Sequence, residues 1–286
     1  MQNDAQRASL AAADAVPAAK PAPSLVRALL KALAYYLYER RLYRGVAKGA
    51  MPRHVGIILD GNRRYGRRMG ITDPVALYRN GADKLDDVLS WCDELRIGTV
   101  TLWVCSTDNL ARGEAELSGI FAAVEAKLAE LAEAPEVHRR RVRVRAIGQL
   151  SRVPDSTLKA IRQTEEATRG YDSLALNIAI AYGGRQEIVD AVIEFLRDAE
   201  ARGAGLKEAM ERLDPASLEP YLYTAGSPDP DLIIRTSGEV RLSGFLLWQS
   251  VHSEFYVSDV YWPAFRKIDF LRAIRAYQER HRRYGL

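Results

Sequence analysis

The sequence predicts a single-domain α/β protein in which a mostly parallel central sheet is flanked by helices. From residue 51 onward, short β-rich apolar segments alternate with longer segments of helical periodicity. The helical segments are long enough to connect parallel strands by right-handed crossovers. No internal repeat and no linker divides residues 51–286, so this part of the chain is expected to form one large core.

Six strands are predicted from short segments, most of them apolar. They cover His54–Leu59, Thr99–Cys105, Arg141–Ile147, Leu174–Ala181, Leu232–Arg235 and a short segment near Glu254–Tyr256. Helices are predicted at Tyr78–Leu95, Glu114–Glu133, Asp155–Arg169, Arg185–Arg202 and Ile268–Tyr284. In an open parallel sheet, ligands bind beyond the carboxyl ends of the strands. The residues that follow each strand are therefore the candidates for a functional site.

Two segments precede this domain. Residues 1–23 are rich in Ala, Pro and small polar residues and are expected to be disordered. Residues 24–50 are expected to contain an amphipathic helix that Ser24 caps. Tyrosines beside Arg40, Arg41 and Arg44 suit the surface of a membrane. The same helix would also suit packing on the body or on a partner subunit, and amphipathicity alone does not separate these interpretations.

The distribution of charge argues against a nucleic-acid binder. The 286-residue chain has a net charge of +4, but residues 1–50 hold eight basic and three acidic residues, so the remaining residues sum to −1. A nearly neutral body is a poor general binder of polyanions. Cys92 and Cys105 lie in apolar runs and are expected to be reduced core thiols of a cytoplasmic protein.

The strongest polar cluster directly follows the first predicted strand. It contains Asp60, Gly61, Asn62, Arg63 and Arg64. Gly61 allows backbone N–H groups to approach an anion, and the two arginines can each donate two hydrogen bonds to phosphate oxygens. Asp60 offers the hard oxygen ligand that suits a Mg²⁺ ion already carrying phosphate. This cluster predicts an anion site with a metal-binding carboxylate.

Weaker clusters follow the second and fourth strands. Ser106 or Thr107 can cap the next helix, whereas Asn109 and Arg112 lie three residues apart and can face one pocket. The turn Gly183-Gly184-Arg185 after the fourth strand is interpreted as mainly structural.

A second strong cluster follows the fifth strand. Arg235, Arg241 and Ser243 can form another anion cradle, and Glu254 is a second candidate Mg²⁺ ligand. The chain has neither a Walker motif nor a Gly-x-Gly-x-x-Gly motif. Two diphosphates and one metal ion fit this set of residues better than a single nucleotide does.

Three of these segments in combination resemble the cis-prenyltransferase (undecaprenyl diphosphate synthase) family. They are His54–Asn62, Ala181–Arg185 and Phe245–Gln249, and the similarity spans about residues 51–286. The resemblance implies a mainly parallel sheet that encloses a hydrophobic tunnel, and a homodimer. It also implies an isoprenyl transferase that uses Mg²⁺ and condenses isopentenyl diphosphate with an allylic diphosphate to make a Z-configured prenyl diphosphate.

The resemblance further implies roles for single residues. Asp60 would bind Mg²⁺ and help the allylic diphosphate to depart, and Asn109 matches an Asn implicated in proton removal. Glu254 matches a second metal carboxylate, which can come from the partner subunit. The positions expected to contact substrate are Gly61, Asn62, Arg63, Arg64, Tyr65, Tyr78, Ser106, Thr107, Asp108, Leu110, Arg112, Arg235, Arg241, Leu242 and Ser243.

The chain also departs from the usual family pattern. The segment Leu77–Gly81 lacks the usual His, and Asp73-Pro74 stands where an Arg is common. Tyr65 and Leu110 replace tryptophans, which resembles actinobacterial short-chain Z,E-farnesyl diphosphate synthases. Val104 aligns where long-chain enzymes carry a small residue near the tunnel entrance. A short product is therefore expected, with a long-chain deca- or undecaprenyl product as the alternative.

Two other classes of protein compete with this interpretation. A trans-prenyltransferase would be all-helical and carry paired Asp-Asp-x-x-Asp motifs, whereas Asp83, Asp86 and Asp87 have the wrong order and are expected on a solvated helix face. A non-catalytic partner subunit of a prenyltransferase would tend to lose the Asp-Gly-Asn loop, which is intact here. The expected location is the cytoplasm, with a peripheral contact at the inner face of the membrane left open.

Overall fold

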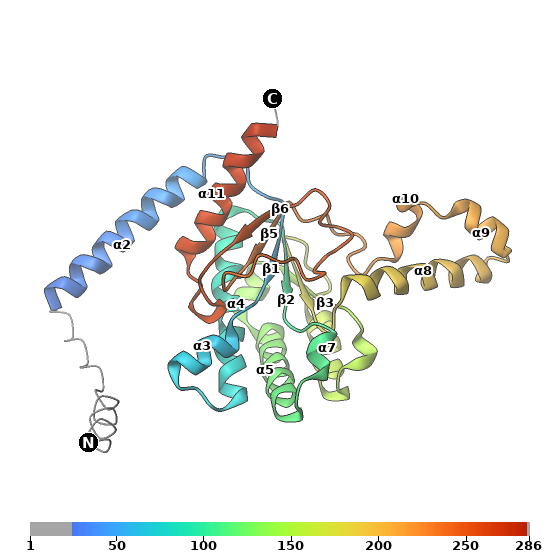
Figure 1. The fold of residues 1–286 in the computed structure, drawn as a ribbon, viewed down its shortest axis with the longest axis horizontal. Coiled ribbons are helices and arrows are strands. Elements are labelled where there is room, and N and C mark those ends of the chain that lie inside the picture. Colours follow the sequence, from blue (N-terminus) through green and yellow to red (C-terminus); the bar gives the residue numbers. More distant parts are fainter. Residues whose placement is uncertain (1–24, 285–286) are drawn as a thin grey trace, which may run out of the picture. The chain divides into compact units, whose positions relative to one another are not determined.

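A computed structural model describes residues 25–284 (Figure 1). The predicted disordered segment and the Ser24 cap lie outside the described residues. The chain divides into two units, one ending at Arg41 and a compact one beginning at Leu42. Helix α2, Leu25–Val46, therefore ends inside the compact unit. There, the side chain of Gln278 donates hydrogen bonds to the carbonyl oxygens of Val46 (2.9 Å) and Ala50 (3.0 Å).

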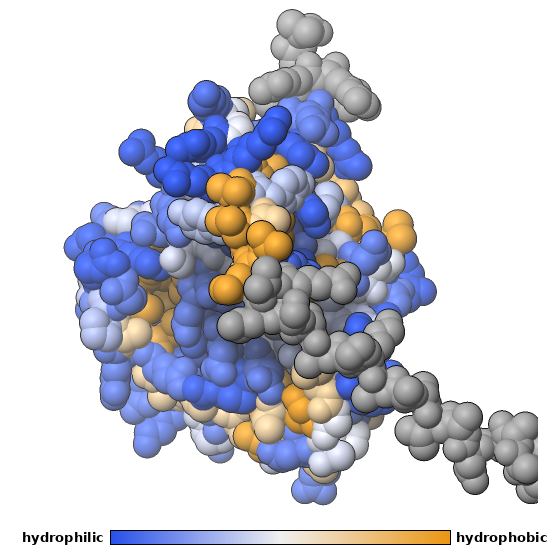
Figure 2. Space-filling view, turned by 90° about the vertical axis from the view of Figure 1, so that its left-hand side faces the viewer, coloured by the Kyte–Doolittle hydropathy of each residue, from blue (hydrophilic) through white to orange (hydrophobic). Residues whose placement is uncertain are grey.

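The part of α2 in the first unit exposes apolar side chains to solvent. They recur at helical spacing, and more than half of the surface of each is exposed. Figure 2 shows exposed hydrophobic side chains gathered in groups on one face of the molecule. The exposed apolar residues of this face are Leu29, Leu30, Leu33, Tyr36 and Leu37. Within residues 25–284, no helix has the length and apolar character needed to cross a bilayer.

The six predicted strands are present, and all of them run parallel. They are β1 His54–Ile58, β2 Thr99–Trp103, β3 Val142–Ile147, β4 Leu174–Ala179, β5 Leu232–Arg235 and β6 Glu254–Val257. Their order in the sheet is β3-β4-β2-β1-β5-β6. The connection after β1 leads to one side of the sheet, and the connection after β5 leads to the other. The β1/β5 pair is therefore the switch point of the topology, which is the usual ligand site of such a sheet.

The long helices were predicted, and the short ones were not. The predicted helices are α4 Pro74–Leu95, α5 Glu114–Glu133, α7 Asp155–Thr168, α8 Gly184–Ala201 and α11 Lys267–Tyr284. Short helices are added at α3 Asn62–Met69, α6 Pro135–Arg139, α9 Leu206–Arg212 and α10 Pro215–Leu218. Helix α4 starts at Pro74 because the Asp73 carboxylate caps it, accepting from the N–H of Val75 (3.3 Å) and of Ala76 (3.0 Å). The residues Asp73-Pro74, at which the chain departs from the usual pattern, therefore form the start of helix α4.

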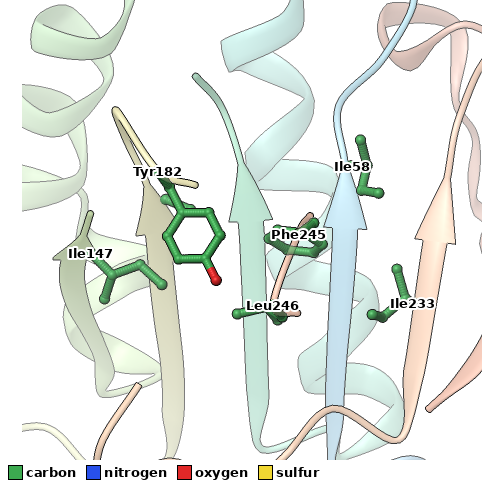
Figure 3. Close-up of a cluster of buried hydrophobic side chains, with 7 residues drawn as sticks. Ile58, Ile147, Tyr182, Ile233, Phe245 and Leu246 are labelled. Atoms are coloured by element: carbon green, nitrogen blue, oxygen red, sulfur yellow. The ribbon is translucent and has the colours of Figure 1, made fainter. Parts of the chain in front are cut away.

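The two faces of the sheet have different roles because side chains alternate along a strand. Leu102 faces a cavity beside α4 and α5, whereas the next residue, Trp103, stacks on Phe245 with 5.3 Å between ring centroids. Phe245 lies in a buried cluster with Tyr182, Leu246 and isoleucines of the strands (Figure 3). A Cβ on Gly56 would stand 2.9 Å from the Phe245 ring, so this strand position requires glycine. The segment Phe245–Gln249 thus covers one face of the sheet, and the cavity lies on the other face.

Candidate active site

The residues after β1 and β5 meet at the switch point of the sheet. Asp60 follows β1, Arg235 ends β5, and Arg235 Nη2 donates to Asp60 Oδ2 at 2.9 Å. Arg64 Nη2 approaches the other carboxylate oxygen at 3.3 Å. Thr236 fixes the loop, because its hydroxyl donates to the Asp60 carbonyl (2.7 Å) and accepts from the Asp60 N–H (2.9 Å). The carboxylate is thus held between two guanidinium groups.

These arginines control the charge of Asp60. Burial alone would raise the pKa of the carboxyl group, but the hydrogen bond from Arg235 and the charges of Arg235 and Arg64 outweigh it. The net result is a pKa below the ordinary value, so Asp60 is an anion at neutral pH. Arg235 is itself nearly buried, with 8% of its surface exposed, and Ser243 Oγ accepts from its Nη1 at 2.8 Å.

The backbone at Gly61 is in a conformation that favours glycine. Its φ is 104°, and a Cβ would stand 2.8 Å from the Tyr261 ring and 3.1 Å from Ser237 Cβ. Helix α3 begins at the next residue, Asn62, so its first N–H groups lie beside Asp60. Asn62 Nδ2 donates to the Leu59 carbonyl at 3.1 Å, while its Oδ1 is buried without a partner among the described residues.

Helix α3 also presents arginines to the site. Arg64 Nη2 donates to Ser237 Oγ (2.5 Å), and its Nη1 donates to Glu239 Oε1 (3.3 Å). Arg63 lies on the more exposed side, 3.8 Å from Glu116. Both arginines therefore lie in the first turn of α3, directly after Gly61.

Helix α4 and the loop after β2 provide the opposite wall. The hydroxyl of Tyr78 donates to Glu116 Oε1 at 2.6 Å, and Arg112 Nη1 reaches the Tyr78 oxygen (3.1 Å) and Glu116 (2.9 Å). Burial raises the pKa of the Tyr78 hydroxyl, and the hydrogen bond to Glu116 raises it further, so Tyr78 stays neutral. Asn109 exchanges hydrogen bonds of 3.1 Å with Ser106, which orients its amide.

A polar cavity of about 630 Å³ lies between these walls. Six arginines and two carboxylates line it, so its net charge favours anions. The arginines are Arg63, Arg64, Arg67, Arg112, Arg235 and Arg241, and the carboxylates are Asp60 and Glu239. Such a cavity can hold two diphosphate groups, since each guanidinium can donate two hydrogen bonds to phosphate oxygens.

An apolar cavity continues from the polar one between the sheet and helices α4 and α5. Leu59, Asn62, Tyr78 and Val104 line both, so the two cavities adjoin. The deeper apolar wall is formed by Leu85, Leu102, Ile120, Val124, Leu128 and Ile178. The enclosed space measures about 60 Å³. An anion site that opens into an apolar channel suits a substrate with a charged head and a hydrocarbon tail.

Comparison with known proteins identifies the family. The family model for undecaprenyl diphosphate synthase, a prenyltransferase model, matches residues 58–285. The chain belongs to this family. It is a cis-prenyltransferase, an enzyme that condenses isoprenyl units into Z-configured prenyl diphosphates.

Two curated relatives are equally similar but differ in product name. The chain is 50% identical to (2Z,6E)-farnesyl diphosphate synthase of Thermobifida fusca over 257 residues, which is 90% of this chain and 99% of the relative. It is also 50% identical to the geranylgeranyl-diphosphate-specific tritrans,polycis-undecaprenyl-diphosphate synthase of Methanopyrus kandleri over 260 residues, or 91% and 94% of the two chains. Sequence identity therefore does not decide the length of the product.

A solved structure supports the fold. It is lavandulyl diphosphate synthase from Lavandula x intermedia in complex with dimethylallyl diphosphate, with a TM-score of 0.72 and 31% sequence identity. The match covers 80% of this chain and 95% of that one. The all-helical alternative is thus excluded by fold as well as by family.

The structure brings most of the predicted site residues of this cis-prenyltransferase into one cavity. They are Asp60, Gly61, Asn62, Arg63, Arg64, Tyr78, Asn109, Arg112, Arg235 and Arg241. Other predicted positions do not line it: Tyr65, Ser106, Thr107, Asp108, Leu110, Leu242 and Ser243. Among these, Ser106 orients Asn109 and Ser243 holds Arg235, so both support residues that do line the cavity.

Glu254 does not lie at this cavity in its own chain. It is the first residue of β6 and pairs in register with Leu232, the first residue of β5, whereas Arg235 lies at the opposite end of β5. The separation along the strand is about 10 Å. Its carboxylate instead accepts from Arg280 at 2.9 Å. A role for Glu254 as a metal ligand within one chain is therefore excluded by position, and only the alternative with a partner subunit stays open.

Sequence reasoning assigned no role to several residues of the site. Glu239 and Arg67 line the cavity, Glu116 orients Tyr78 and Arg112, and Ser237 binds Arg64. Glu239 was recognisable, since an acid within a cluster of arginines after a strand is a candidate partner for them. Glu116 was not, because it looks like an ordinary residue in the first turn of a helix.

The donor set at Asp60 fits a divalent ion that arrives with diphosphate. Each carboxylate oxygen accepts one arginine and retains a second lone pair. Among the described residues, no group of three or more His, Cys, Asp or Glu side chains could hold a metal ion. Mg²⁺ needs no such group, because it is commonly held by one or two carboxylates together with phosphate oxygens and water.

Proposed function

We propose that this cis-prenyltransferase joins isopentenyl diphosphate to a short allylic diphosphate and releases a short product, with Z,E-farnesyl diphosphate as the preferred candidate. The observation that carries the proposal is the Asp60–Arg235 pair in the polar cavity, which adjoins the apolar cavity at Leu59 and Asn62. An anionic ligand for a metal would then lie between two groups of arginines, beside a channel for hydrocarbon.

The two diphosphates are assigned to the two arginine groups. The allylic diphosphate binds at Gly61, Asn62, Arg63 and Arg64, where α3 begins, and its hydrocarbon tail enters the apolar cavity past Val104. Isopentenyl diphosphate binds at Arg235 and Arg241. Arg235 is preorganised for this, because Asp60 and Ser243 fix its guanidinium before substrate arrives.

In the reaction, C4 of isopentenyl diphosphate attacks C1 of the allylic substrate. A C–C bond forms, the bond between C1 and the diphosphate oxygen breaks, and a proton leaves C2 of the isopentenyl unit. The arginines stabilise the negative charge that develops on the departing diphosphate. Mg²⁺ held by Asp60 would supply further neutralisation of that charge.

The proton needs an acceptor other than Asn109. An amide is not a base at neutral pH, and the Ser106 contacts instead orient the Asn109 amide toward a positioning role. Both carboxylates of the cavity already engage arginines. A diphosphate oxygen of the substrate pair is therefore the best available acceptor.

A product assay tests this proposal. The purified chain is incubated with labelled isopentenyl diphosphate, Mg²⁺ and geranyl, farnesyl or geranylgeranyl diphosphate, and the dephosphorylated products are sized. A short Z-configured product supports the proposal. Products of ten or more isoprene units support the long-chain alternative, and the absence of any product from the chain alone supports a non-catalytic partner subunit.

We further propose that a second copy covers an apolar face of α8 and α9. Val189, Ile193 and Leu196 recur at helical spacing on α8, and between 37% and 51% of their surface is exposed. Leu206 and Met210 of α9 are 70% and 66% exposed. A homodimer buries such a face, and in such a dimer the resemblance assigns the second metal carboxylate, Glu254, to the partner subunit.

Mixing two inactive variants tests this shared site. Asp60→Asn and Glu254→Gln chains each lack one residue, but a mixed dimer has one site in which both residues are intact. Random mixing then restores about a quarter of the wild-type activity. If the mixture stays inactive although mixed dimers form, Glu254 does not act across an interface.

The exposed face of α2 is proposed to bind the inner surface of the cytoplasmic membrane. Its leucines are flanked by exposed Lys31, Arg40, Arg41 and Arg44, which suit anionic lipid headgroups. Vesicles of phosphatidylglycerol should bind the full chain, and Leu33→Asp with Leu37→Asp should abolish binding. Retention on neutral vesicles alone, or a loss of dimer in the variant, would favour a protein contact instead.

A further inference from the structure

Within residues 29–280, Lys127 is the one residue that lines both the apolar cavity and a second cavity next to it. The second cavity, called the outer cavity here, measures about 320 Å³ and lies beyond Lys127 along α4 and α5. The apolar part of its lining consists of Leu89, Leu131, Ala134, Val137 and Val142, and the polar part consists of Asp86, Ser90, Glu130, Glu136 and Arg140. The apolar part of the outer cavity would extend the hydrocarbon channel if Lys127 did not stand between the two cavities.

Lys127 is an unusual residue for this position. Only 7% of its side chain is exposed, and its other neighbours in the apolar cavity include Val124 and Leu128. Its ammonium group lies 2.6 Å from Asp86 Oδ2 on α4 and 3.3 Å from Glu130 Oε2 on α5. The apolar stem thus covers the end of the apolar cavity, while the charged end ties α4 to α5 on the polar side.

We propose that Lys127 is the stop that limits the length of the growing prenyl chain, an inference that rests on the prenyl transfer proposed above. A longer chain would have to displace the lysine stem, separate the ammonium group from its two carboxylates, and strip water from Asp86 and Glu130, which are 66% and 44% exposed. Hydrocarbon offers those charges no hydrogen bonds in return, so the passage is unfavourable.

The depth of Lys127 fits a short product. On α5, Glu116 contacts Tyr78 at the polar cavity, and Lys127 lies eleven residues further along the helix. The rise of an α-helix makes this distance about 16 Å, which is enough for roughly three extended isoprene units. The stop therefore lies where a farnesyl-sized chain would end.

Two substitutions separate the contributions of stem and charge. Lys127→Ala removes both and joins the two cavities, and Lys127→Met keeps most of the stem without the charge. The matched control is Lys84→Ala, which removes an ion pair with Asp87 (2.7 Å) within α4, at a residue that lines neither cavity. Each chain receives geranyl or farnesyl diphosphate with labelled isopentenyl diphosphate, and products are sized after dephosphorylation.

The expected result is a shift of the main product by one or more isoprene units in Lys127→Ala, a smaller shift in Lys127→Met, and none in Lys84→Ala. Melting temperatures identify a variant that fails to fold, in which case the remaining Lys127 variant decides. Unchanged product lengths in the folded variants overturn the stop, as does a wild-type product of ten or more units. By contrast, a wild-type chain that makes no product at all overturns the proposed function.

Discussion

Replacing Asp60 by Asn tests the centre of the site with the smallest change of shape. The substitution removes one negative charge and leaves an oxygen that can still accept from one arginine. Hydrogen bonds to charged groups contribute about 1.5–3 kcal/mol each. The Arg235 contact lies toward the upper end of that range, since the Arg235 side chain is 9% exposed. The loss of the carboxylate proposed to bind Mg²⁺ adds to this.

Together these losses predict a decrease in kcat of about 10²–10⁴-fold, which corresponds to about 3–5 kcal/mol of transition-state stabilisation. The effect on folding should be smaller. Asp60 is 29% exposed and Arg64 is 35% exposed, so water screens their pair, and the Asn oxygen can keep a weaker hydrogen bond from Arg235. We expect the free energy of unfolding to fall by about 1–2 kcal/mol, or roughly 2–8 °C in melting temperature.

Glu239→Gln is the matched control because it makes the same change of charge in the same cavity. Glu239 pairs with Arg64 at 3.3 Å and with Arg241 at 2.8 Å but has no contact with Arg235. We expect less than about a tenfold loss of kcat, since half-exposed pairs contribute little. Single-turnover assays over a range of Mg²⁺ concentrations measure both variants. Equal losses in the two would show that Asp60 acts only as a charge, and the assigned role would be wrong.

Three further predictions concern the backbone, the pH dependence and the channel. Gly61→Ala should destabilise the chain by about 1–3 kcal/mol and abolish activity, because φ is 104° and the new Cβ meets Tyr261. The control is Gly70→Ala, where φ is 71° and no atom of the described residues lies near the new Cβ. It should lower the free energy of unfolding by about 1 kcal/mol and leave kcat unchanged. Thermal melts and rates measure both, and equal activities would contradict this account. Burial raises the pKa of Glu187, although the hydrogen bonds that Tyr182 and Gln249 donate to its carboxylate act in the opposite direction. Ionisation of Glu187 therefore lowers the stability of the fold as the pH rises above 4.5. The melting temperature of Glu187→Gln should increase relative to that of the wild type from pH 4 to pH 7. A constant or shrinking difference would show that the pKa is not raised. Val104→Ala should widen the junction of the two cavities and lengthen the products, which the same sizing assay detects. Products of unchanged length would show that Val104 contributes to packing alone.

The sequence was sufficient to predict the strands of the sheet, but not the residues at which they end. The predicted strands ran past Ile58, Trp103 and Ala179 because the next residues are still apolar. In the structure those residues leave the sheet and lead into the loops of the site. Helix α3 was not predicted because Asn62–Met69 is mostly polar, contains Gly66 and buries only that residue. A Cβ on Gly66 would stand 2.4 Å from Leu77, so α3 depends on tertiary contact with α4.

The position of Glu254 could have been derived from the sequence. A residue that opens a strand of a parallel sheet lies at the amino edge, and Asp60, which follows a strand, lies at the carboxyl edge. The resemblance to the family assigned both residues to one metal site without that step. If the direction of the strands had been considered first, a metal site with both residues from one chain would have been excluded. Only a site shared between two copies of the chain would have been left.

Product length is harder to predict from sequence than chemistry is, and the reason lies in the fold. The residues assigned to diphosphate binding follow strands, so the topology gathers them at one edge, and they appear in the sequence as compact clusters such as Asp60–Arg64. The residues that line the apolar cavity lie largely on helices α4 and α5 and have no cluster of their own in the sequence. Lys127 has the appearance of a solvated helix position, and it is buried because the neighbouring helix α4 packs against α5 and supplies Asp86 as its partner. Substitutions at such positions can change the length of the channel while every diphosphate ligand stays in place.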